Sequence, residues 1–388
     1  MKSKIKAAAG ILTIFFTAGF ATLARAENFD GLQGQLNLKM TFLNETPSLG
    51  SNGISYLPSL RKPLYFGERF KIDGEATVNI HAASGREEGQ PRLNLKKEVT
   101  PHRFWGRIFS DDIEARLGLQ KISFGPGKTL RALQWFDHID PHDPTAFTKG
   151  VQAALMRGYL ENNTNLWGWI LYGNRDAIGI SPFSTAREQP EFGGRIQFPV
   201  RDSELAFSFH QRSIEANLHS SQSHSDLKRE EKTENRIGFD GQWDLGFGLW
   251  TEWTLIQIEK SKDLPRQHLS IALGGDYTFD VGNGLYCSLE VMQNEVSSDS
   301  QEYTNKSERI MAWTQQYPLD LLDQLSLITL WNSEQEGESF YGSWKRIYDD
   351  TMINMSLFYK ASPKRKTGQS QPARIEERGI QFVIQYNH

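Results

Sequence analysis

The chain has 388 residues, a formal net charge of −4 and a mean hydropathy of −0.52. This mildly acidic balance argues against a general nucleic-acid-binding protein. The single cysteine, Cys287, excludes a disulfide within this sequence.

The N-terminus has the pattern of an export signal. Three lysines within the first six residues precede an uncharged apolar stretch over residues 7–23, and Ala24-Arg25-Ala26 follows. The stretch is shorter than the roughly 20 apolar residues that a spanning helix needs. We therefore predict a signal peptide over residues 1–26, cleaved before Glu27. Its removal leaves 362 residues with a charge of about −8, because it carries four cations and no acid.

The C-terminal residues alternate between apolar and polar side chains from Ile380 to Asn387. Such period-two alternation predicts a strand with one apolar face. Bacterial outer-membrane barrels typically end in a strand of this kind, through which we expect the barrel-assembly machinery to engage the chain. His388 stands where a terminal phenylalanine is usual.

Similar alternation recurs along the chain, for example over 204–210 and 236–243. Periodicity alone fits either a soluble sandwich or a membrane barrel. The links decide between them, because from residue 151 onward short links such as 161–164 alternate with long ones such as 174–190 and 213–233. This alternation is typical of an up-and-down outer-membrane barrel, with apolar side chains facing lipid and polar ones facing water.

The strand count follows from these links and from parity. We expect twelve strands between residues 151 and 388 and one weak strand between 44 and 68. Further strands are expected near 31–43, 70–83, 92–109 and 113–124. The sum is odd, so we predict an all-β, transmembrane antiparallel β-barrel of 16 or 18 strands over residues 27–388. At about 20 to 23 residues per strand, this is the size of barrels that leave an aqueous channel.

Tryptophans near strand ends or turns support a barrel, because barrels concentrate aromatic residues in two interfacial girdles. The alternative is simple β-propensity, which also enriches aromatic residues in strands. The residues concerned are Trp167, Trp169, Trp243, Trp250, Trp253, Trp313, Trp331 and Trp344.

One segment, 125–150, breaks the alternation with the sequence GPGKTLRALQWFDHIDPHDPTAFTKG. Its apolar residues Leu130, Leu133, Trp135 and Phe136 need burial, and the interior of a wide barrel offers it. We therefore predict an inward-folded loop that narrows the pore and sets its charge. The candidate constriction residues are Lys128, Arg131, Asp137, His138, Asp140, His142 and Asp143.

Five of these residues, from Asp137 to Asp143, could also supply oxygen and nitrogen ligands to a divalent metal. The alternative is a hydrated loop in which the aspartates cap turns beside Pro141 and Pro144. No recognised ligand spacing is present, so we predict neither a metal nor a cofactor.

Polar faces of the expected strands supply candidates for the pore wall. They are Arg116, Gln120, Arg195, Gln197, Glu204, His210, Arg212, Arg236, Asp240 and Asp276. Such side chains either select ions and polar solutes or pair across strands to stiffen the wall.

The stretch Arg116–Pro144, RLGLQKISFGPGKTLRALQWFDHIDPHDP, resembles a pattern in barrels of the alginate-export and related porin-like families. There a strand with Leu-Gly-x-Gln leads to a glycine-containing turn and a loop bearing Asp-Pro. A looser likeness covers 160–173 and 190–195. The resemblance implies the fold and an outer-membrane location. Alginate exporters have a strongly cationic pore, whereas these polar faces mix arginine with acids, so alginate is not implied.

The sequence thus predicts a Gram-negative outer-membrane channel for small polar or charged solutes, surrounded by lipid, with its C-terminus in the periplasm. The oligomeric state stays open. A plugged structural or assembly barrel is an alternative. A barrel-based hydrolase is a weaker one, because His210 and Ser213 lie in no recognised motif and neither H-E-x-x-H nor G-x-S-x-G occurs. We predict that the protein is not an enzyme.

Overall fold

The computed structural model describes most of the predicted barrel. The described residues are 31–43, 52–61, 64–66, 69–85, 94–138, 147–177, 179, 181–219, 227–261, 264–298, 305–333, 337–361 and 376–388. The predicted signal peptide, 1–26, lies outside them. Among the described residues, no helix is long and apolar enough to cross a membrane.

The described chain is built from strands. The first half contains β1 (Leu32–Leu43), β2 (Asn52–Arg61), β3 (Leu64–Phe66), β4 (Phe70–Gly85), β5 (Asn94–Phe109), β6 (Ile113–Gln120), β7 (Val151–Tyr159), β8 (Asn165–Leu171), β9 (Ser184–Thr185) and β10 (Glu191–Val200). The second half contains β11 (Ser203–His219), β12 (Leu227–Asp244), β13 (Gly248–Ile258), β14 (Gln267–Phe279), β15 (Leu285–Ser297), β16 (Lys306–Pro318), β17 (Asp323–Asn332), β18 (Gly337–Ile347), β19 (Thr351–Ala361) and β20 (Glu376–Asn387).

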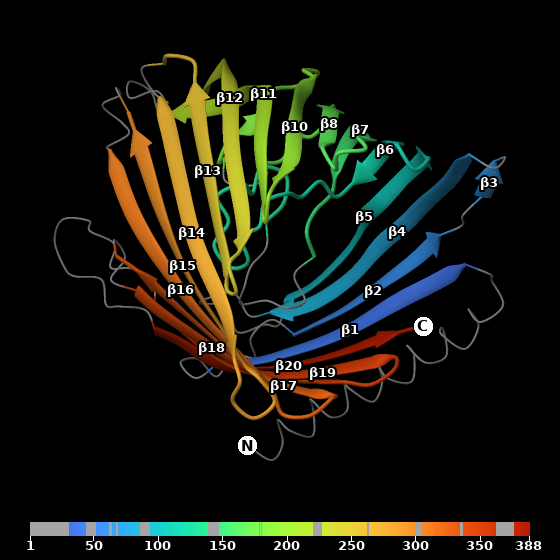
Figure 1. Cartoon of the computed structure of the whole chain (residues 1–388), viewed down its shortest axis with the longest axis vertical. Helices are drawn as coiled ribbons and strands as arrows, with labels where there is room; N and C mark the ends of the chain where they lie inside the picture. The colour runs from blue at the N-terminus through green and yellow to red at the C-terminus, as the bar shows by residue number, and fades with distance from the viewer. Residues whose placement is uncertain are drawn as a thin grey trace.

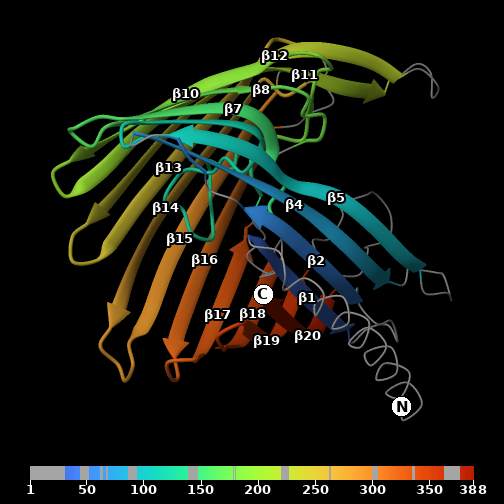
Figure 2. The same ribbon diagram turned by 90° about the vertical axis from the view of Figure 1, so that its right-hand side faces the viewer.

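Neighbouring strands pair antiparallel around a closed ring, in which β20 pairs with both β19 and β1 (Figures 1 and 2). Two short pieces do not add to the ring. β3 pairs with β4 just beyond the end of β2, and β9 pairs with β11 just beyond the end of β10. The described residues therefore form an 18-stranded all-β barrel, which confirms the predicted fold class and the higher of the two strand counts.

The expected twelve strands after residue 150 are wrong by one, because the twelve links recognised there separate thirteen strands. The predicted long loop 213–233 is also largely strand, since β11 and β12 pair out to His219 and Leu227. Together with five strands before residue 150, where β2 and β3 count as one, these thirteen strands give the even total of 18.

Apolar and polar faces alternate as period two requires. In β13, Trp253 is 49% exposed on the outer face, whereas its neighbour Glu252 on the inner face is fully buried. The same contrast separates Phe209 from His210 in β11. Exposed apolar side chains on the outside of a closed barrel suit contact with lipid, and polar ones on the inside suit water or each other.

Short and long links lie at opposite ends of the barrel. We call the end with links 110–112, 160–164, 201–202, 245–247, 280–284, 319–322 and 348–350 the short-turn end, and the other the long-loop end. The last residue lies at the short-turn end, where His388 N–H donates to Gly34 C=O at 3.0 Å.

The terminal His388 ring occupies a notch between two tyrosines. Its ring stacks on Tyr56 with centroids 6.0 Å apart and on Tyr386 at 6.3 Å. Its Nε2 lies 3.1 Å from the Tyr56 hydroxyl. Gly34 forms the floor, because a Cβ there would collide with the imidazole. The histidine thus fills an aromatic position on the outside of the β20–β1 closure.

We expect His388→Ala to destabilise the folded barrel by about 1–2 kcal/mol, because two stacked aromatic contacts are lost. His388→Phe should keep both contacts. Gly34→Val should resemble His388→Ala, since the added methyl groups displace the ring. Urea unfolding in detergent micelles measures the difference, and equal midpoints for wild type and His388→Ala would contradict the role of the notch.

Candidate functional site

The segment 121–137, between β6 and β7, contacts inner-face side chains of distant strands. Figure 1 shows its trace, coloured teal, on the concave side of β10–β13. The Glu252 carboxylate of β13 accepts hydrogen bonds from Gly127 N–H at 2.7 Å and from Leu133 N–H at 3.0 Å. Gly125 and Gly127 lie so close to this carboxylate that a Cβ at either would meet Glu252 Oε1.

A second carboxylate, Glu290 of β15, accepts hydrogen bonds from three successive N–H groups. Lys128, Thr129 and Leu130 donate at 2.9, 2.8 and 3.0 Å. Glu290 is 1% exposed. Charged acceptors make stronger hydrogen bonds than neutral ones, and a buried carboxylate without donors is costly. The carboxylates of the two glutamates and the backbone N–H groups at the tip of segment 121–137, which we define as residues 127–133, therefore supply each other's hydrogen-bond partners.

The apolar residues of the segment are buried against β7 and β8. Trp135 and Phe136 pack with each other and with Phe124, and Phe136 also packs with Trp169 of β8, at ring-centroid distances between 5.4 and 6.4 Å. Trp135 Nε1 donates to Thr254 Oγ1 at 2.8 Å. The inner faces of β7 and β8 are apolar where this cluster covers them, at Val151, Ala153 and Leu155 and at Trp169 and Leu171.

The predicted tryptophan girdles are accordingly wrong for three residues. Trp167, Trp169 and Trp250 face inward, and the last two are each 2% exposed. Trp253, Trp313 and Trp331 lie on the outer face, as expected. An inward-facing tryptophan follows from the buried segment: Trp169 contacts its aromatic rings, and Trp250 Nε1 donates to Glu290 at 3.2 Å.

Lys128 extends from the tip of the segment toward β14 and β15. Its ammonium group forms an ion pair with Asp276 and donates to the Tyr286 hydroxyl at 2.9 Å. Burial lowers the pKa of Lys128, but the hydrogen bonds to Asp276 and Tyr286 outweigh it, so the pKa lies above its usual value. Lys128 is therefore a cation at neutral pH, with its charge balanced by Asp276.

The other predicted constriction residues differ in position. Arg131 and Asp137 pair with each other at 2.9 Å and are buried, and Arg131 also donates to Phe124 C=O. His138 is exposed, with Nδ1 3.3 Å from Gln134 Oε1. Asp140, His142 and Asp143 lie outside the described residues, so the metal hypothesis stays untested.

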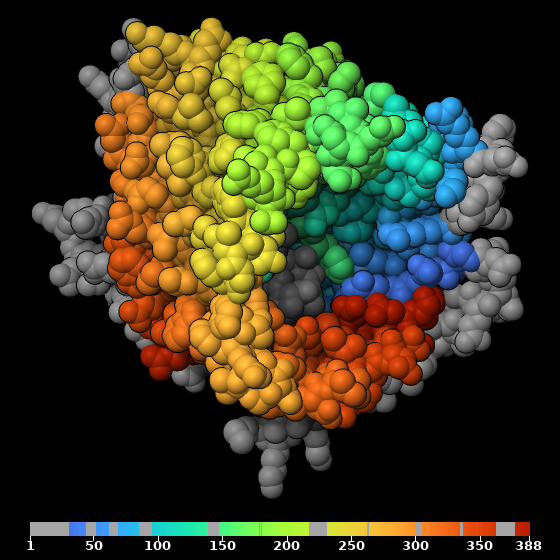
Figure 3. Space-filling model, in the orientation of Figure 1, coloured from blue at the N-terminus to red at the C-terminus, as the bar shows by residue number. Residues whose placement is uncertain are grey.

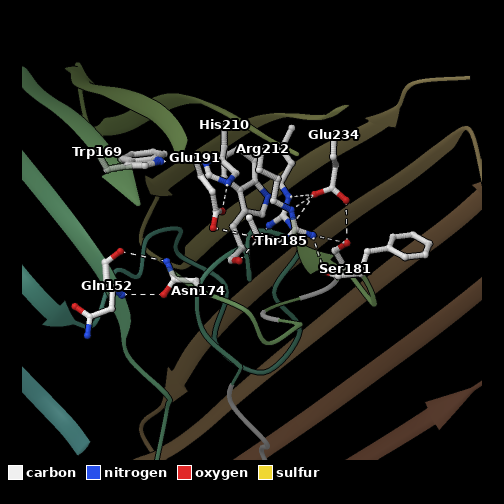
Figure 4. A network of polar contacts seen from close by, with 12 residues as sticks. Gln152, Trp169, Asn174, Ser181, Thr185, Glu191, His210, Arg212 and Glu234 are labelled. Carbon is white, nitrogen blue, oxygen red and sulfur yellow. Dashed lines mark hydrogen bonds and ion pairs between the residues drawn. The ribbon is translucent and has the colours of Figure 1, made fainter. Parts of the chain in front are cut away.

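The inner wall of β11 and β12 carries a buried charge network (Figure 4). Glu234 accepts hydrogen bonds from Arg212 Nε at 2.7 Å and from Arg236 Nε at 2.8 Å. Ser181 links to both Arg212 and Glu234, at 2.8 and 2.9 Å. Arg236 also donates to Trp135 C=O at 3.1 Å. This network joins the wall to segment 121–137.

His210 belongs to an adjoining set of buried side chains, also drawn in Figure 4. Its Nε2 lies 3.1 Å from Glu191 Oε2, and Trp169 Nε1 donates to its Nδ1 at 3.2 Å. Thr185 Oγ1 donates to Glu191 at 3.0 Å. An imidazole enclosed in this way has no access to solvent, and His210 is 0% exposed.

Toward the short-turn end, Arg195 makes a two-pronged pair with Asp240, at 2.5 and 2.9 Å. Gln197 donates to Glu204 at 2.5 Å. All ten predicted wall residues lie on the inner face, and on β10–β12 their charges pair across strands. Gln120 of β6 is also engaged, since its Nε2 donates to Ala153 C=O at 2.9 Å.

Arg116 belongs to an arginine-rich sector on β5–β7. Glu114 lies 3.2 Å from Arg107, 2.9 Å from Arg116 and 3.8 Å from Arg157. Arg157 also stacks over Trp167, 3.9 Å from the ring centroid. The three arginine side chains keep 16–23% of their surface exposed, so this sector faces the interior more openly than the network of Figure 4.

Sequence reasoning missed the carboxylates that hold these elements: Glu191, Glu234, Glu252 and Glu290. It also missed a second inner segment, 181–186, whose Phe183 packs with Ile214, Ile258 and Leu264. The polar glutamate positions were visible in the alternation of each strand. Their partners were not, because Gly127 and Glu252 are 125 residues apart in sequence.

No family model matches the chain, and no curated protein matches it either. Solved structures do. Wzi of Escherichia coli, described as an outer-membrane, carbohydrate-binding β-barrel involved in group 1 capsule assembly, aligns with a TM-score of 0.56 and 12% identity. The alignment covers 94% of this chain and 86% of Wzi. OccK7 of Pseudomonas aeruginosa aligns with a TM-score of 0.54 and 11% identity, over 92% of this chain and 98% of OccK7. The fold is that of an outer-membrane β-barrel. At this identity the likeness shows the fold alone.

Proposed function

We propose that this outer-membrane β-barrel is a channel for small polar solutes, narrowed by segments 121–137 and 181–186. The observation that carries the proposal is the chemistry of the inner face. It is polar on most strands, and among the described residues the two segments pack against it on β7, β8, β10–β15 and, through Thr129, on β16. Figure 3 shows a hollow in the middle of the molecule, bordered by the N-terminal and C-terminal strands on one side.

The positions of the charges support a pore that selects among polar solutes and discriminates little between cations and anions. On β10–β15 several inner-face charges are neutralised by a counter-charge, as in the pairs Arg195–Asp240 and Lys128–Asp276, while Glu252 and Glu290 accept backbone N–H groups. Paired charges stiffen a wall and present little net field to a passing ion. We also propose that residues 1–26 are an export signal and that the protein lies in an outer membrane. Its short-turn end would then face the periplasm.

Single-channel recording with cysteine modification tests the channel. In a Cys287→Ser background, Ser326→Cys places a thiol on the inner face of β17, and Leu327→Cys places one on the outer face. We expect stepwise conductance in a planar bilayer. A bulky cationic thiol reagent should lower the current through Ser326→Cys and leave Leu327→Cys unaffected.

Two results would contradict the proposal. A folded, inserted wild-type barrel that passes no current would favour a plugged structural barrel. Equal effects of the reagent at both positions would place the conducting path outside the inner face.

A further inference from the structure

One row of inner-face side chains is free of charge across six neighbouring strands. The strand register places its members directly opposite one another from β15 through β16, β17, β18, β19 and β20. We call this set the hydroxyl–amide row; it consists of Tyr286, Gln316, Ser326, Ser343, Ser356 and Gln381.

The row is built as a hydrogen-bonding surface. Ser356 Oγ lies 2.6 Å from the Tyr341 hydroxyl and donates to Asn354 Oδ1 at 2.6 Å. Gln316 Oε1 accepts from Gln324 at 3.0 Å. At the β15 end, Tyr286 contacts Lys128, so the row begins beside the tip of segment 121–137. Tyr286, Gln316 and Ser356 are therefore held by hydrogen bonds within the protein, and the hydroxyl and amide groups of the row keep further donor and acceptor capacity for a solute.

Two observations indicate that a ligand or water completes the row. Gln381 is 6% exposed, yet its Oε1 has no hydrogen-bond partner among the described residues. Buried amide groups are rarely left unsatisfied. At the β15–β18 end, Gln316, Ser326 and Ser343 are partly exposed and open to the interior.

One neighbouring row places two aromatic rings beside it, a buried tyrosine and a partly exposed phenylalanine. Tyr341 of β18 lies opposite Phe358 of β19, one step toward the long-loop end. Lys345 lies one step toward the short-turn end. Hydroxyl and amide groups beside an aromatic face suit an uncharged solute with many hydroxyls, because they replace its hydration without requiring a counter-charge.

The direction of the row also matters. It runs perpendicular to the strands and spans about 24 Å at the usual strand spacing of about 4.8 Å. Strands of such barrels tilt by about 35–45° from the barrel axis, so the row climbs by roughly 15 Å along the axis. Ser356 and Gln381 are buried, so a solute would exchange equivalent hydrogen bonds along the partly exposed members from Tyr286 to Ser343, about 14 Å of the row.

We infer that the hydroxyl–amide row binds uncharged polyhydroxylated solutes, saccharides above all, and guides them through the barrel. The inference rests on the proposed channel function and specifies its solute class. The charged wall of β10–β15 holds the inner segments in place, and the uncharged row on β15–β20 contacts the solute.

The test is interruption of the ion current by a neutral glucose hexamer, compared with a hexamer of galacturonic acid. We expect the neutral hexamer to interrupt the wild-type current more strongly. The triple variant Gln316→Met, Ser326→Ala, Ser343→Ala should bind it about tenfold more weakly, as expected for the loss of one or two net hydrogen bonds. Gln315→Met, the same substitution on the outer face of β16, should bind it like wild type.

Three results would overturn the inference: equal affinity in the triple variant, no interruption by the neutral hexamer, or stronger interruption by the acidic hexamer. The last would assign the solute site to the arginine sector around Glu114 instead. Calorimetric titration of the detergent-folded barrel with the same hexamers separates the two proposals. Binding without conductance would support the saccharide-binding row and contradict the channel. Conductance without binding would support the channel and contradict the saccharide-binding row.

Discussion

Replacing both Glu252 and Glu290 by alanine is expected to raise the single-channel conductance severalfold. The two carboxylates accept five backbone N–H groups from the tip of segment 121–137. Hydrogen bonds to a charged group contribute about 1.5–3 kcal/mol each. Without them the tip should detach from β13 and β15, while Trp135 and Phe136 keep the rest of the segment on β8.

A reversible cross-link provides the matched control. Thr129 Oγ1 and Thr314 Oγ1 lie 3.4 Å apart, so cysteines at both positions, in a Cys287→Ser background, place their thiols within reach of a disulfide. Added to the double alanine variant, this pair should restore the wild-type conductance under oxidising conditions and lose it on reduction. A conductance that changes with neither the alanine substitutions nor the cross-link would show that the tip does not narrow the conducting path.

Glu234→Ala is expected to destabilise the barrel by about 3–5 kcal/mol, because it leaves the Arg212 and Arg236 guanidinium groups buried without their shared counter-charge. Glu234 is fully buried between them. Urea unfolding in detergent micelles, followed by tryptophan fluorescence, measures the loss. Glu234→Gln should fall between alanine and wild type, since it keeps the shape and one acceptor oxygen.

Glu204→Ala is the control for an inner-face glutamate that is exposed and, among the described residues, pairs with the neutral Gln197. Its cost should stay within about 0.5 kcal/mol. Equal losses for Glu204→Ala and Glu234→Ala would contradict the view that the network of Arg212, Glu234 and Arg236 stabilises the wall.

The sequence determined the barrel because its signals are local. Alternation with period two and the alternation of link lengths are visible within windows of about ten residues, and they fix the strands and their faces. For this reason all ten wall candidates, from Arg116 to Asp276, lie on the inner face. Strand ends were less exact: β6 ends at Gln120, whereas the expected strand ran to 124.

The pairing within the site could not be predicted in the same way. Whether Arg195 meets Asp240, or Lys128 meets Asp276, depends on strand register and on a segment that crosses the interior. One sequence feature did carry this information. β7 and β8 have apolar residues on both faces, such as Leu155 beside Met156, and a strand of that kind needs a cover on its inner side.

Segment 121–137 also has a mechanical consequence. It connects β6 and β7 to β13 and β15 across the interior, so it acts as a brace between two parts of a wall that otherwise touch only through intervening strands. A thin closed sheet resists stretching along its strands better than flattening of its cross-section. A brace anchored by buried carboxylates on one side and stacked aromatic rings on the other opposes that flattening. The shape of the opening, and not only its width, would then be set by this one segment.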